Sequence, residues 1–534
     1  MASVLSAAVC VLLLLSPAAA INVLILHPVY AGSHELTLRV LGEQMVARGH
    51  NVTQIRFLSR KSKPVDSPVE LLSRTVNNTD LRSSYFDRDG VFVPPTDLLW
   101  QRTRRLSSLP TDVFSMTHAF CESLLGDHHL FESLRQRRFD VALVDIISNE
   151  CGLALAAALK LPVVGFWGFS FVGGESHATS TMNLPSVTPT FLSDTGPQMG
   201  FTARLYNTLC MIVHKVLLQV QFRIANEYIQ RHYPTLPDAA TLVSNIDMVL
   251  VHSNFLASQP VLLPPNVQMI GCTQCRDARP LPKDYEDFMQ SAGEHGVIVF
   301  SLGITGYEAL SVPDDYIEAF MNVFGRLKQK VLMRFTASRL KRVPSNVKVV
   351  DYLPQIDVLG HNQTRVFVTH CGMNGMMEAF YAGVPLLGVP IFGDQGDNSK
   401  FMHHRELGIG LDKFGLTEEI LMDSLNKLLY INKYRDNVRR VRDIWRMEPE
   451  SATDRALHWI ELVSRFGAPS HLRMVDGHLR WYQYWLLDVA AVYAAVLLAA
   501  VMVVVLGVRG CLRRLTGKAV TTPVSPRKTK AKKE

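Results

Sequence analysis

The chain has 534 residues, enough for two or three folded domains, and its 48% hydrophobic and 19% charged residues exclude a wholly disordered protein. The formal net charge is +7, but the last 26 residues carry +8, which leaves −1 for the other 508 residues. The folded part is therefore not basic, and a nucleic-acid-binding function loses its main support.

Residues 1–20 are typical of a secretory signal peptide. An apolar run extends from Val4 to Leu15, and Ser16-Pro17 and three alanines then supply the small residues that a signal peptidase requires. The next residues, Ile21–Leu26, are predicted to form the first buried strand of the mature protein. We therefore expect the folded part to begin at residue 21 and to enter the secretory pathway.

The first half of the mature chain alternates short apolar runs with helical stretches. Strands are predicted at 21–26, 51–57, 141–144 and 161–165, and helices at 34–48 and 151–159. Such alternation is typical of βαβ units with a parallel sheet. The stretches 60–136 and 169–232 are less regular, and we interpret them as insertions that shape a pocket.

The same alternation restarts after the proline-rich segment 260–282. Strands are predicted at 296–301, 331–335, 347–350, 366–369 and 386–389, and helices at 418–429, 435–446 and 453–466. This pattern predicts a second α/β domain. Two such domains place a crevice between the carboxyl ends of their strands, where open α/β sheets bind ligands.

The run from Val489 to Val508 is apolar and uncharged over 20 residues, which is long enough to span the roughly 30 Å hydrocarbon core of a bilayer. An aromatic cluster at 481–485 precedes it, and arginines at 509, 513 and 514 follow it. The positive side of the helix is therefore the C-terminal one. This asymmetry predicts a lumenal body and a basic cytosolic tail over residues 509–534.

Short motifs agree with a lumenal body. The sequons at Asn51, Asn77 and Asn362 are candidate glycosylation sites. In an oxidising compartment six cysteines are available for disulfides, and the sequence leaves their pairing open: Cys121, Cys151, Cys210, Cys272, Cys275 and Cys371. Lysines three and five residues from the end of the tail resemble the dilysine signal that returns membrane proteins to the endoplasmic reticulum.

The most informative segment is Val366 to Asn398. A short apolar strand leads into the polar turn Thr369–Gly375, after which apolar residues resume at helical spacing. A helix that begins there directs free backbone N–H groups and its positive dipole end at a bound anion. The segment therefore predicts a site for a diphosphate, with the polar residues Asp394 and Gln395 following the next strand.

The segment resembles the signature of the UDP-glycosyltransferases, the family that includes the UDP-glucuronosyltransferases. The matching residues are Thr369, His370, Gly372, Asn374, Gly375, Glu378, Ala379, Gly383, Pro385, Asp394, Gln395, Asp397 and Asn398. The resemblance covers nearly the whole chain and implies the GT-B fold, in which two Rossmann-like domains face a central crevice. It implies an acceptor-binding domain at 21–275, a UDP-sugar-binding domain at 276–465, a return segment at 466–488 and a transmembrane helix at 489–508.

His34 and Asp145 resemble the catalytic dyad of this family. His34 follows the first strand at the expected start of a helix, where the dipole disfavours the imidazolium form and keeps the ring able to accept a proton. Asp145 ends another strand of the same predicted sheet. In this interpretation His34 deprotonates the acceptor, and Asp145 orients the ring and stabilises its positive charge.

The resemblance also assigns the donor site. The residues that it assigns to UDP binding are Ser301, Arg334, Tyr352, Gln355, His370, Gly372, Asn374, Gly375 and Glu378. Glu378 is expected to accept hydrogen bonds from both ribose hydroxyls, and Asp394 and Gln395 from the donor sugar. The fold characteristically uses no metal, and because the UDP-sugar is a co-substrate, no cofactor is expected.

Three positions depart from the family pattern. Tyr352 replaces the usual tryptophan that stacks on uracil, Cys371 replaces a glycine beside His370, and Ile304 stands where a serine is common. Tyr352 offers a smaller stacking face. A side chain at residue 371 can crowd the phosphate if the backbone there needs a glycine conformation.

The sequence thus predicts an inverting UDP-sugar glycosyltransferase, single-pass in the endoplasmic reticulum membrane. Its expected partners are UDP-glucuronate or UDP-glucose and a small lipophilic acceptor that presents a hydroxyl. Two alternatives stay open: a membrane-lipid glycosyltransferase of the ceramide type, and a catalytically impaired regulatory partner of related enzymes. The donor sugar, the acceptor and a homo- or hetero-oligomeric state are also left open.

Overall fold

The computed structural model describes residues 20–27, 32–58, 66–75, 109–169, 184–190, 193, 195–196, 198–303, 312–391, 393–467, 470–472 and 479–517. The chain divides into a body that ends at Arg473 and a C-terminal unit that begins at Met474. The predicted signal peptide up to residue 19, the sequon at Asn77 and the tail beyond residue 517 lie outside the described residues.

The body contains two parallel sheets. The first has seven strands in the order β3-β2-β1-β4-β5-β6-β7. Their bounds are β1 Asn22–Leu26, β2 Asn51–Leu58, β3 Glu70–Thr75, β4 Val141–Asp145, β5 Val163–Trp167, β6 Met248–Val251 and β7 Val267–Met269. Every paired strand runs parallel to its neighbour, and apolar side chains of β1 and β4 are buried on both faces of the sheet. This is the burial expected of a sheet that helices cover on both sides.

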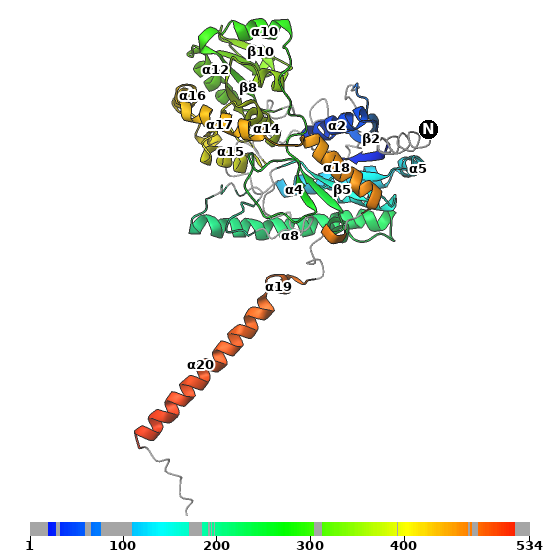
Figure 1. The fold of residues 1–534 in the computed structure, drawn as a ribbon, viewed down its shortest axis with the longest axis vertical. Helices are drawn as coiled ribbons and strands as arrows, with labels where there is room; N and C mark the ends of the chain where they lie inside the picture. The colour runs from blue at the N-terminus through cyan, green and yellow to red at the C-terminus, as the bar shows by residue number, and fades with distance from the viewer. Residues whose placement is uncertain are drawn as a thin grey trace, which may run out of the picture. The chain divides into compact units, whose positions relative to one another are not determined.

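Helices cover the first sheet on both faces (Figure 1). They are α2 Gly32–Ala47, α4 Leu109–Leu125, α5 His128–Gln136, α6 Glu150–Ala158, α8 Phe201–His232 and α9 Ala239–Ser244. The helix predicted at 34–48 corresponds to α2, which begins at Gly32. His34 in its first turn is hydrogen-bonded to Asp145, the last residue of β4, so it lies at the carboxyl end of the sheet.

The second sheet has six parallel strands in the order β10-β9-β8-β11-β12-β13. Its strands are β8 Val297–Ser301, β9 Lys330–Arg334, β10 Val347–Val350, β11 Thr364–Thr369, β12 Leu386–Gly388 and β13 Gly408–Gly410. Its helices are α10 Lys283–Gln290, α12 Asp314–Gly325, α13 Gln355–Leu359, α14 Met373–Ala382, α15 Gln395–His404, α16 Glu418–Tyr430 and α17 Asn432–Trp445. The prediction of two α/β domains is therefore confirmed.

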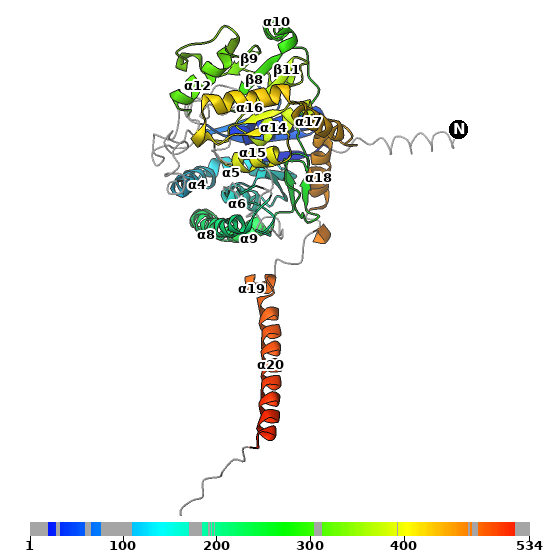
Figure 2. The ribbon, with the colours of Figure 1, turned by 90° about the vertical axis from the view of Figure 1, so that its left-hand side faces the viewer.

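The last helix of the body, α18 Ala452–Phe466, lies within the range expected for the second domain but packs on the first (Figures 1 and 2). Its apolar residues Ala456, Leu457, Ile460 and Val463 are buried in one cluster with β1, β4 and α2. The helix therefore follows the second domain in the chain but completes the core of the first.

The stretches 60–136 and 169–232, predicted to be less regular than the rest of the first half, nevertheless contain three helices. Helices α4, α5 and α8 occupy residues 109–125, 128–136 and 201–232. The pattern of α8 conceals it, because Asn207 is buried and Leu205 is exposed in its first half, while Phe222 and Ile229 are buried in its second half. Most of the apolar residues of the first half face outward and those of the second half face inward, so no single apolar stripe runs along the whole helix.

Two disulfides form among the described cysteines. Cys121 on α4 is bonded to Cys151 on α6, and Cys272 is bonded to Cys275 in the segment between the two sheets. The first joins two helices that cover the same face of the first sheet. The second closes a loop with a sequence separation of only 3.

We expect the double substitution Cys121→Ser/Cys151→Ser to lower the free energy of unfolding by about 2–5 kcal/mol. The sequence separation of 30 gives this bond a large effect on the entropy of the unfolded chain. Denaturant or thermal unfolding of the purified protein would measure it. The matched variant Cys272→Ser/Cys275→Ser opens a much shorter loop, so its loss of stability is expected to be smaller; an equal loss would contradict this explanation.

The C-terminal unit contains α19 Trp481–Tyr484 and the long helix α20 Leu487–Leu515. α20 has a mean hydropathy of 2.9 over its most apolar window and no buried residue. Arg513 and Arg514 lie in its last turn. It is long and apolar enough to cross a membrane, as the run from Val489 to Val508 predicts.

Candidate active site

His34 and Asp145 lie together at the carboxyl end of the first sheet. His34 is in the first turn of α2 and Asp145 is the last residue of β4. The His34 Nδ1 atom is 2.7 Å from Asp145 Oδ2, and the two side chains are 5% and 0% exposed. Since the carboxylate accepts a hydrogen bond from Nδ1–H, the neutral ring carries its proton on Nδ1 and has an unprotonated Nε2 that can act as a base.

The segment that follows β5 fixes the imidazole from the other side. A Cβ atom added at Gly168 would lie 2.7 Å from His34 Cε1, so only glycine allows this close approach. Phe169 packs edge-on against the imidazole with ring centroids 4.7 Å apart. Sequence analysis did not identify either residue. The signal available was their position directly after a buried strand, where backbone approaches the site.

A second histidine, His252, also lies near the crevice. It follows β6, is completely buried and stacks against Phe166 with ring centroids 5.6 Å apart. Burial, reinforced by the nearby His34, lowers the pKa of His252 to about 3, so its ring is neutral at physiological pH. A neutral ring adds no positive charge beside His34. Sequence analysis missed His252. The available signal was its position directly after a parallel strand, where site residues of α/β proteins commonly lie.

The turn between β11 and α14 has the geometry of a phosphate site. Gly372 is the N-cap of α14, so the first backbone N–H groups of that helix point out of its N-terminus beside His370. Burial lowers the pKa of His370 to about 4, which leaves its ring neutral. The arrangement offers several uncharged donors to a diphosphate.

Cys371 adopts the left-handed conformation expected of the glycine that it replaces, with φ 66°. Its side chain is completely buried in a core cluster with Met373 and Met402, and a Cβ atom added at Gly388 would lie 2.3 Å from its sulfur. Burial raises the pKa of the thiol to about 12. The thiol is therefore a protonated packing group, and it does not occupy the space above the turn.

We expect Gly372→Ala to weaken UDP binding by about tenfold or more, because a Cβ atom there would lie 2.4 Å from His370 Nε2 and must displace the ring. Titration calorimetry with UDP would measure the change. Gly415→Ala is the control in the same domain and outside the proposed donor site, since its added Cβ would meet nothing within 4 Å. Equal effects of the two substitutions would show that the His370 contact is not the cause.

Glu378 on α14 is the acceptor for two amide side chains. Gln355 Nε2 donates to its Oε2 at 2.6 Å, and Gln274 Nε2 donates to its Oε1 at 3.3 Å. Gln355 begins α13, whereas Gln274 lies between the paired cysteines of the inter-domain segment. Burial raises the pKa of Glu378 to about 7, and these hydrogen bonds oppose that effect. The carboxyl group is held in a defined orientation, as a ligand for paired hydroxyls requires.

This pKa predicts a pH dependence of donor binding. The ribose hydroxyls are donors and favour the carboxylate form of Glu378, so the affinity for a UDP-sugar is expected to fall as the pH drops below about 7, by up to about tenfold per pH unit. Binding isotherms between pH 8 and pH 6 would measure it. Glu378→Gln cannot titrate, and its weaker binding is expected to be flat over this range; an unchanged slope would assign the effect to another group.

Asp394 and Gln395 lie at the start of α15 and are almost completely buried. Asp394 Oδ2 accepts a hydrogen bond from Asn398 Nδ2 at 2.6 Å, and burial raises the pKa of Asp394 to about 6. The nearby His34 acts in the opposite direction on this pKa, so the two residues are close enough to interact electrostatically. Gln395 Oε1 accepts from the backbone N–H of Ile391 at 2.8 Å, and its carbonyl oxygen thereby stabilises the preceding loop.

The remaining predicted donor residues lie around the same strand ends. Ser301 ends β8, and its buried Oγ has no hydrogen-bond partner among the described residues. Arg334 ends β9, and its guanidinium donates to the carbonyl oxygens of Gly303 and Asp351. Tyr352 is 72% exposed, which leaves its ring face accessible for stacking. The structure therefore brings an unpartnered hydroxyl and an exposed aromatic ring to the carboxyl edge of the second sheet.

The two halves of the site meet directly. Asn374 Nδ2, in the first turn of α14, donates to Thr37 Oγ1 of α2 at 2.9 Å. Thr37 lies one turn after His34, and its hydroxyl in turn donates to the carbonyl oxygen of Ser33. The helix expected to hold the diphosphate is thus hydrogen-bonded to the helix that carries the histidine, across a sequence separation of 337.

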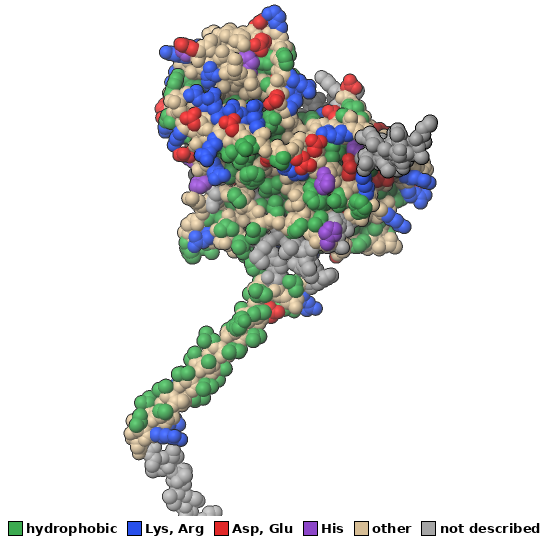
Figure 3. Space-filling view, in the orientation of Figure 1, with side chains coloured by type: hydrophobic (Ala, Val, Ile, Leu, Met, Phe, Trp, Pro, Cys, Tyr) green, Lys and Arg blue, Asp and Glu red, His purple; other side chains and the backbone are tan. Residues whose placement is uncertain are grey.

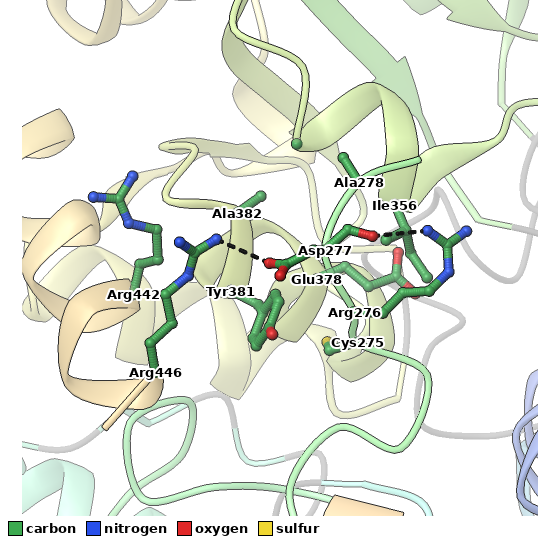
Figure 4. Close-up of a pocket in the computed structure, with 11 residues that line it drawn as sticks. Cys275, Arg276, Asp277, Ala278, Ile356, Glu378, Tyr381, Ala382, Arg442 and Arg446 are labelled. Carbon is green, nitrogen blue, oxygen red and sulfur yellow. Dashed lines mark hydrogen bonds and ion pairs between the residues drawn. The ribbon is translucent and has the colours of Figure 1, made fainter. Parts of the chain in front are cut away.

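A small cavity of about 130 Å³ lies beside Glu378, between α14, α17 and the inter-domain segment (Figure 4). Arg446 pairs with Asp277 at 3.3 Å, and Arg276 makes two bonds to Asp357. Drug-sized ligands occupy about 300–1,000 Å³, so this cavity is too small for a nucleotide sugar. Its paired arginines instead anchor the segment that carries Gln274.

Residues 22–522 match the family described as "UDP-glucoronosyl and UDP-glucosyl transferase". The chain is similar to UDP-glucuronosyltransferase 1A9 of Mus musculus, with 31% identity over 477 residues that cover 89% of each chain. It is also similar to UDP-glucuronosyltransferase 2B19 of Macaca fascicularis, with 31% identity over 90% of this chain and 91% of the relative.

Solved structures share the fold. A UDP-glucosyltransferase from Polygonum tinctorium aligns with a TM-score of 0.57 at 16% identity, over 84% of this chain and 99% of the other. The glycosyltransferase VinC in complex with dTDP aligns with a TM-score of 0.55 at 17% identity, over 83% of this chain and 100% of the other. The predicted GT-B arrangement of two parallel-sheet α/β domains is thereby confirmed.

Proposed function

The chain belongs to the UDP-glucuronosyl and UDP-glucosyl transferase family and is a UDP-sugar glycosyltransferase, and from this premise we propose which of its residues perform the transfer. His34 and Asp145 form the catalytic dyad. The observation that carries this assignment is the 2.7 Å hydrogen bond between His34 Nδ1 and Asp145 Oδ2 in a buried position at the sheet edge. It leaves His34 Nε2 as the free acceptor of a proton.

In the proposed reaction, His34 Nε2 removes the proton from the acceptor hydroxyl while the acceptor oxygen attacks C1 of the donor sugar. The new C1–O bond forms on the face opposite the departing UDP, so the configuration at C1 inverts. The bond between C1 and the phosphate oxygen breaks, and its electron pair leaves with UDP. Asp145 stabilises the imidazolium that forms, and the proton can later pass to solvent.

The leaving group is stabilised by groups that are already in place. Backbone N–H groups at the N-terminus of α14, together with His370, Gly372, Asn374 and Gly375, would bind the diphosphate. Ser301 and Arg334 would contact the phosphates and the base, and Tyr352 would stack on uracil with Gln355 beside it. Glu378 would accept from the ribose hydroxyls, and Asp394 with Gln395 would bind the sugar hydroxyls.

Each of the two sheets belongs to a domain that binds a different substrate. We assign residues 21–275 to acceptor binding and residues 276–465 to UDP-sugar binding, with α18 returning from the second domain to the first. The acceptor is a small lipophilic compound with a hydroxyl group. The hydrogen bond from Asn374 to Thr37 supports this division, because it places the donor helix against the helix that carries the base.

The location of the reaction is proposed to be the lumen of the endoplasmic reticulum. The N-terminal signal at 1–20, α20 with arginines in its last turn and the lysines near the C-terminus support a single-pass type I protein. Asn51 and Asn362 lie at exposed positions, as glycosylation requires. A shift in electrophoretic mobility after endoglycosidase treatment, lost on joint substitution of Asn51, Asn77 and Asn362, would test the lumenal orientation.

The activity test is incubation of microsomes that contain the protein with labelled UDP-glucuronate, UDP-glucose or UDP-galactose and a panel of phenols and steroids. We expect transfer from at least one donor by the wild type, and a rate lower by about 10²-fold or more with His34→Ala. Ceramide in the same panel tests the lipid glycosyltransferase alternative. If wild type and His34→Ala are equally inactive with every donor while UDP still binds, the catalytic assignment fails and the regulatory alternative is favoured.

A further inference from the structure

The helix α8 has an unusual distribution of side chains over residues 201–220. Its inner face carries polar groups that the protein satisfies: Asn207 is completely buried, accepts from the backbone N–H of Thr190 at 2.7 Å, and donates to the carbonyl oxygens of Pro185 and Thr188. Met211 is buried on the same side, but most of the large apolar side chains of this half of the helix are exposed. A helix that packs on a core usually turns such side chains inward.

The exposed apolar residues form one stripe. Leu205, Leu209, Ile212, Val216 and Val220 follow one another at intervals of three or four residues, and Phe201, Tyr206 and Val213 lie beside them. Phe201 is 73% exposed, Leu205 63% and Val216 58%. Contiguous exposure of this kind marks an interaction surface, whereas single exposed apolar residues do not.

The charge of α8 indicates what the stripe contacts. Residues 201–226 contain Arg204, Lys215 and Arg223 and no acidic residue; the first is Glu227. A two-fold contact with a second copy would set these like charges against one another. A bilayer with anionic lipid headgroups instead complements an apolar stripe flanked by cations, which is the composition of helices that lie in a membrane interface.

The same chain also carries a candidate membrane anchor, α20. Only 14 residues, 473–486, lie in the sequence between the last described residue of the body and the start of α20. A contact between α8 and the membrane that holds α20 is therefore made within one chain, and such tethering favours even weak interfacial binding by raising the effective concentration.

α8 itself passes a length and hydropathy test for a membrane span, but its packing excludes that role. Phe222, Ala225 and Ile229 of its second half are buried in the core cluster of the first sheet, together with residues of α4 and α6. In the first half, only the outer side of the helix is exposed. Figures 1 and 2 show α8 along the edge of the body farthest from the second sheet, and Figure 3 shows apolar side chains on the surface there.

We propose that the outer face of α8 over residues 201–220 lies in the headgroup and acyl boundary of the membrane that α20 anchors. The contact is a second attachment of the body, and it holds the first domain against the bilayer. If that domain binds the acceptor, which rests on the proposed function, lipophilic acceptors can reach it directly from the membrane in which they dissolve. The contact itself does not depend on catalysis.

The test uses the full chain in vesicles of phosphatidylcholine with phosphatidylserine, with the photoreactive residue p-benzoylphenylalanine at Leu209, Ile212 or Val216. Illumination is expected to form lipid adducts at all three positions. The control is the same residue at Gln230, which is exposed on the polar second half of the same helix and is expected to give only background. UDP binding by each variant shows that the body is folded, independently of turnover.

Three results would overturn the proposal. Equal lipid adducts at Gln230 would show that contact is non-specific, and no adduct at any of the three apolar positions would show that α8 faces water. Adducts to a second copy of the chain would identify a dimer interface instead. As a further readout, the double substitution Ile212→Glu/Val216→Glu is expected to abolish the lipid adduct at Leu209, since it places charges in the stripe.

Discussion

His34→Ala is expected to lower kcat by about 10²–10⁴-fold with little change in the affinity for UDP. The acceptor hydroxyl would then have to lose its proton to water, because the base that Asp145 orients has been removed. The side chain of His34 is almost fully buried and its Nδ1 is hydrogen-bonded to Asp145, which fixes the position of Nε2. Initial rates with an active donor and acceptor pair, with UDP affinity measured by calorimetry, would check both parts.

His50→Ala is the matched control for this substitution. His50 is also buried, but it lies after α2 at the opposite end of the helix, where its Nε2 is 3.4 Å from Glu461 of α18. Its loss is expected to reduce stability and to leave kcat of the folded protein unchanged. Turnover by His34→Ala above about a tenth of the wild-type value would contradict the assignment of His34 as the base.

Asp145→Asn is expected to lower kcat by about 10²–10⁴-fold while the fold is retained. The amide can place an N–H opposite His34 Nδ1, and the ring would then carry its proton on Nε2, where the acceptor's proton must go. The imidazolium also loses its counter-charge. Because both effects act through His34, the double variant His34→Ala/Asp145→Asn is expected to be no slower than His34→Ala alone, and rate measurements on the three variants would show this non-additivity.

Asp140→Asn provides the comparison on the same strand segment. Asp140 precedes β4 at the amino end of the sheet, where its Oδ2 accepts from the backbone N–H of Asn22 at 2.7 Å. Its substitution is expected to cost stability without a change in kcat. If the Asp145 and His34 substitutions instead reduced kcat by independent factors that multiply in the double variant, the aspartate would have a role of its own at the reacting atoms.

The segment from β11 to α15 illustrates what could be predicted from sequence. The strand, the turn and the helix follow from residues that are adjacent in the chain, and the four-residue interval between Asn374 and Glu378 places both on one face of α14. The departure at Cys371 was also visible. The direction of its side chain was not, because the core cluster that receives the thiol includes Met402, which belongs to a later helix.

Other features of the site lay beyond sequence reasoning. Gly168 is significant only because the His34 ring passes within contact distance of its backbone, and Gln274 because the loop closed by Cys272 and Cys275 turns it toward Glu378. The order of strands in a sheet decides which strand ends are neighbours. β1 and β4 are adjacent although more than a hundred residues separate them, and that adjacency brings Asp145 to His34.

The sequence by itself determined the two α/β domains, the long apolar C-terminal helix and the strand–turn–helix unit at 366–382, because each depends on the spacing of apolar and polar residues within a short segment. Only the tertiary structure decided which disulfides form, how α8 is oriented and that Thr37 receives a hydrogen bond from Asn374. These depend on the packing of elements from distant parts of the chain. Packing energy is the sum of many weak contacts. The spacing of residues within one segment does not indicate which distant segments will make those contacts.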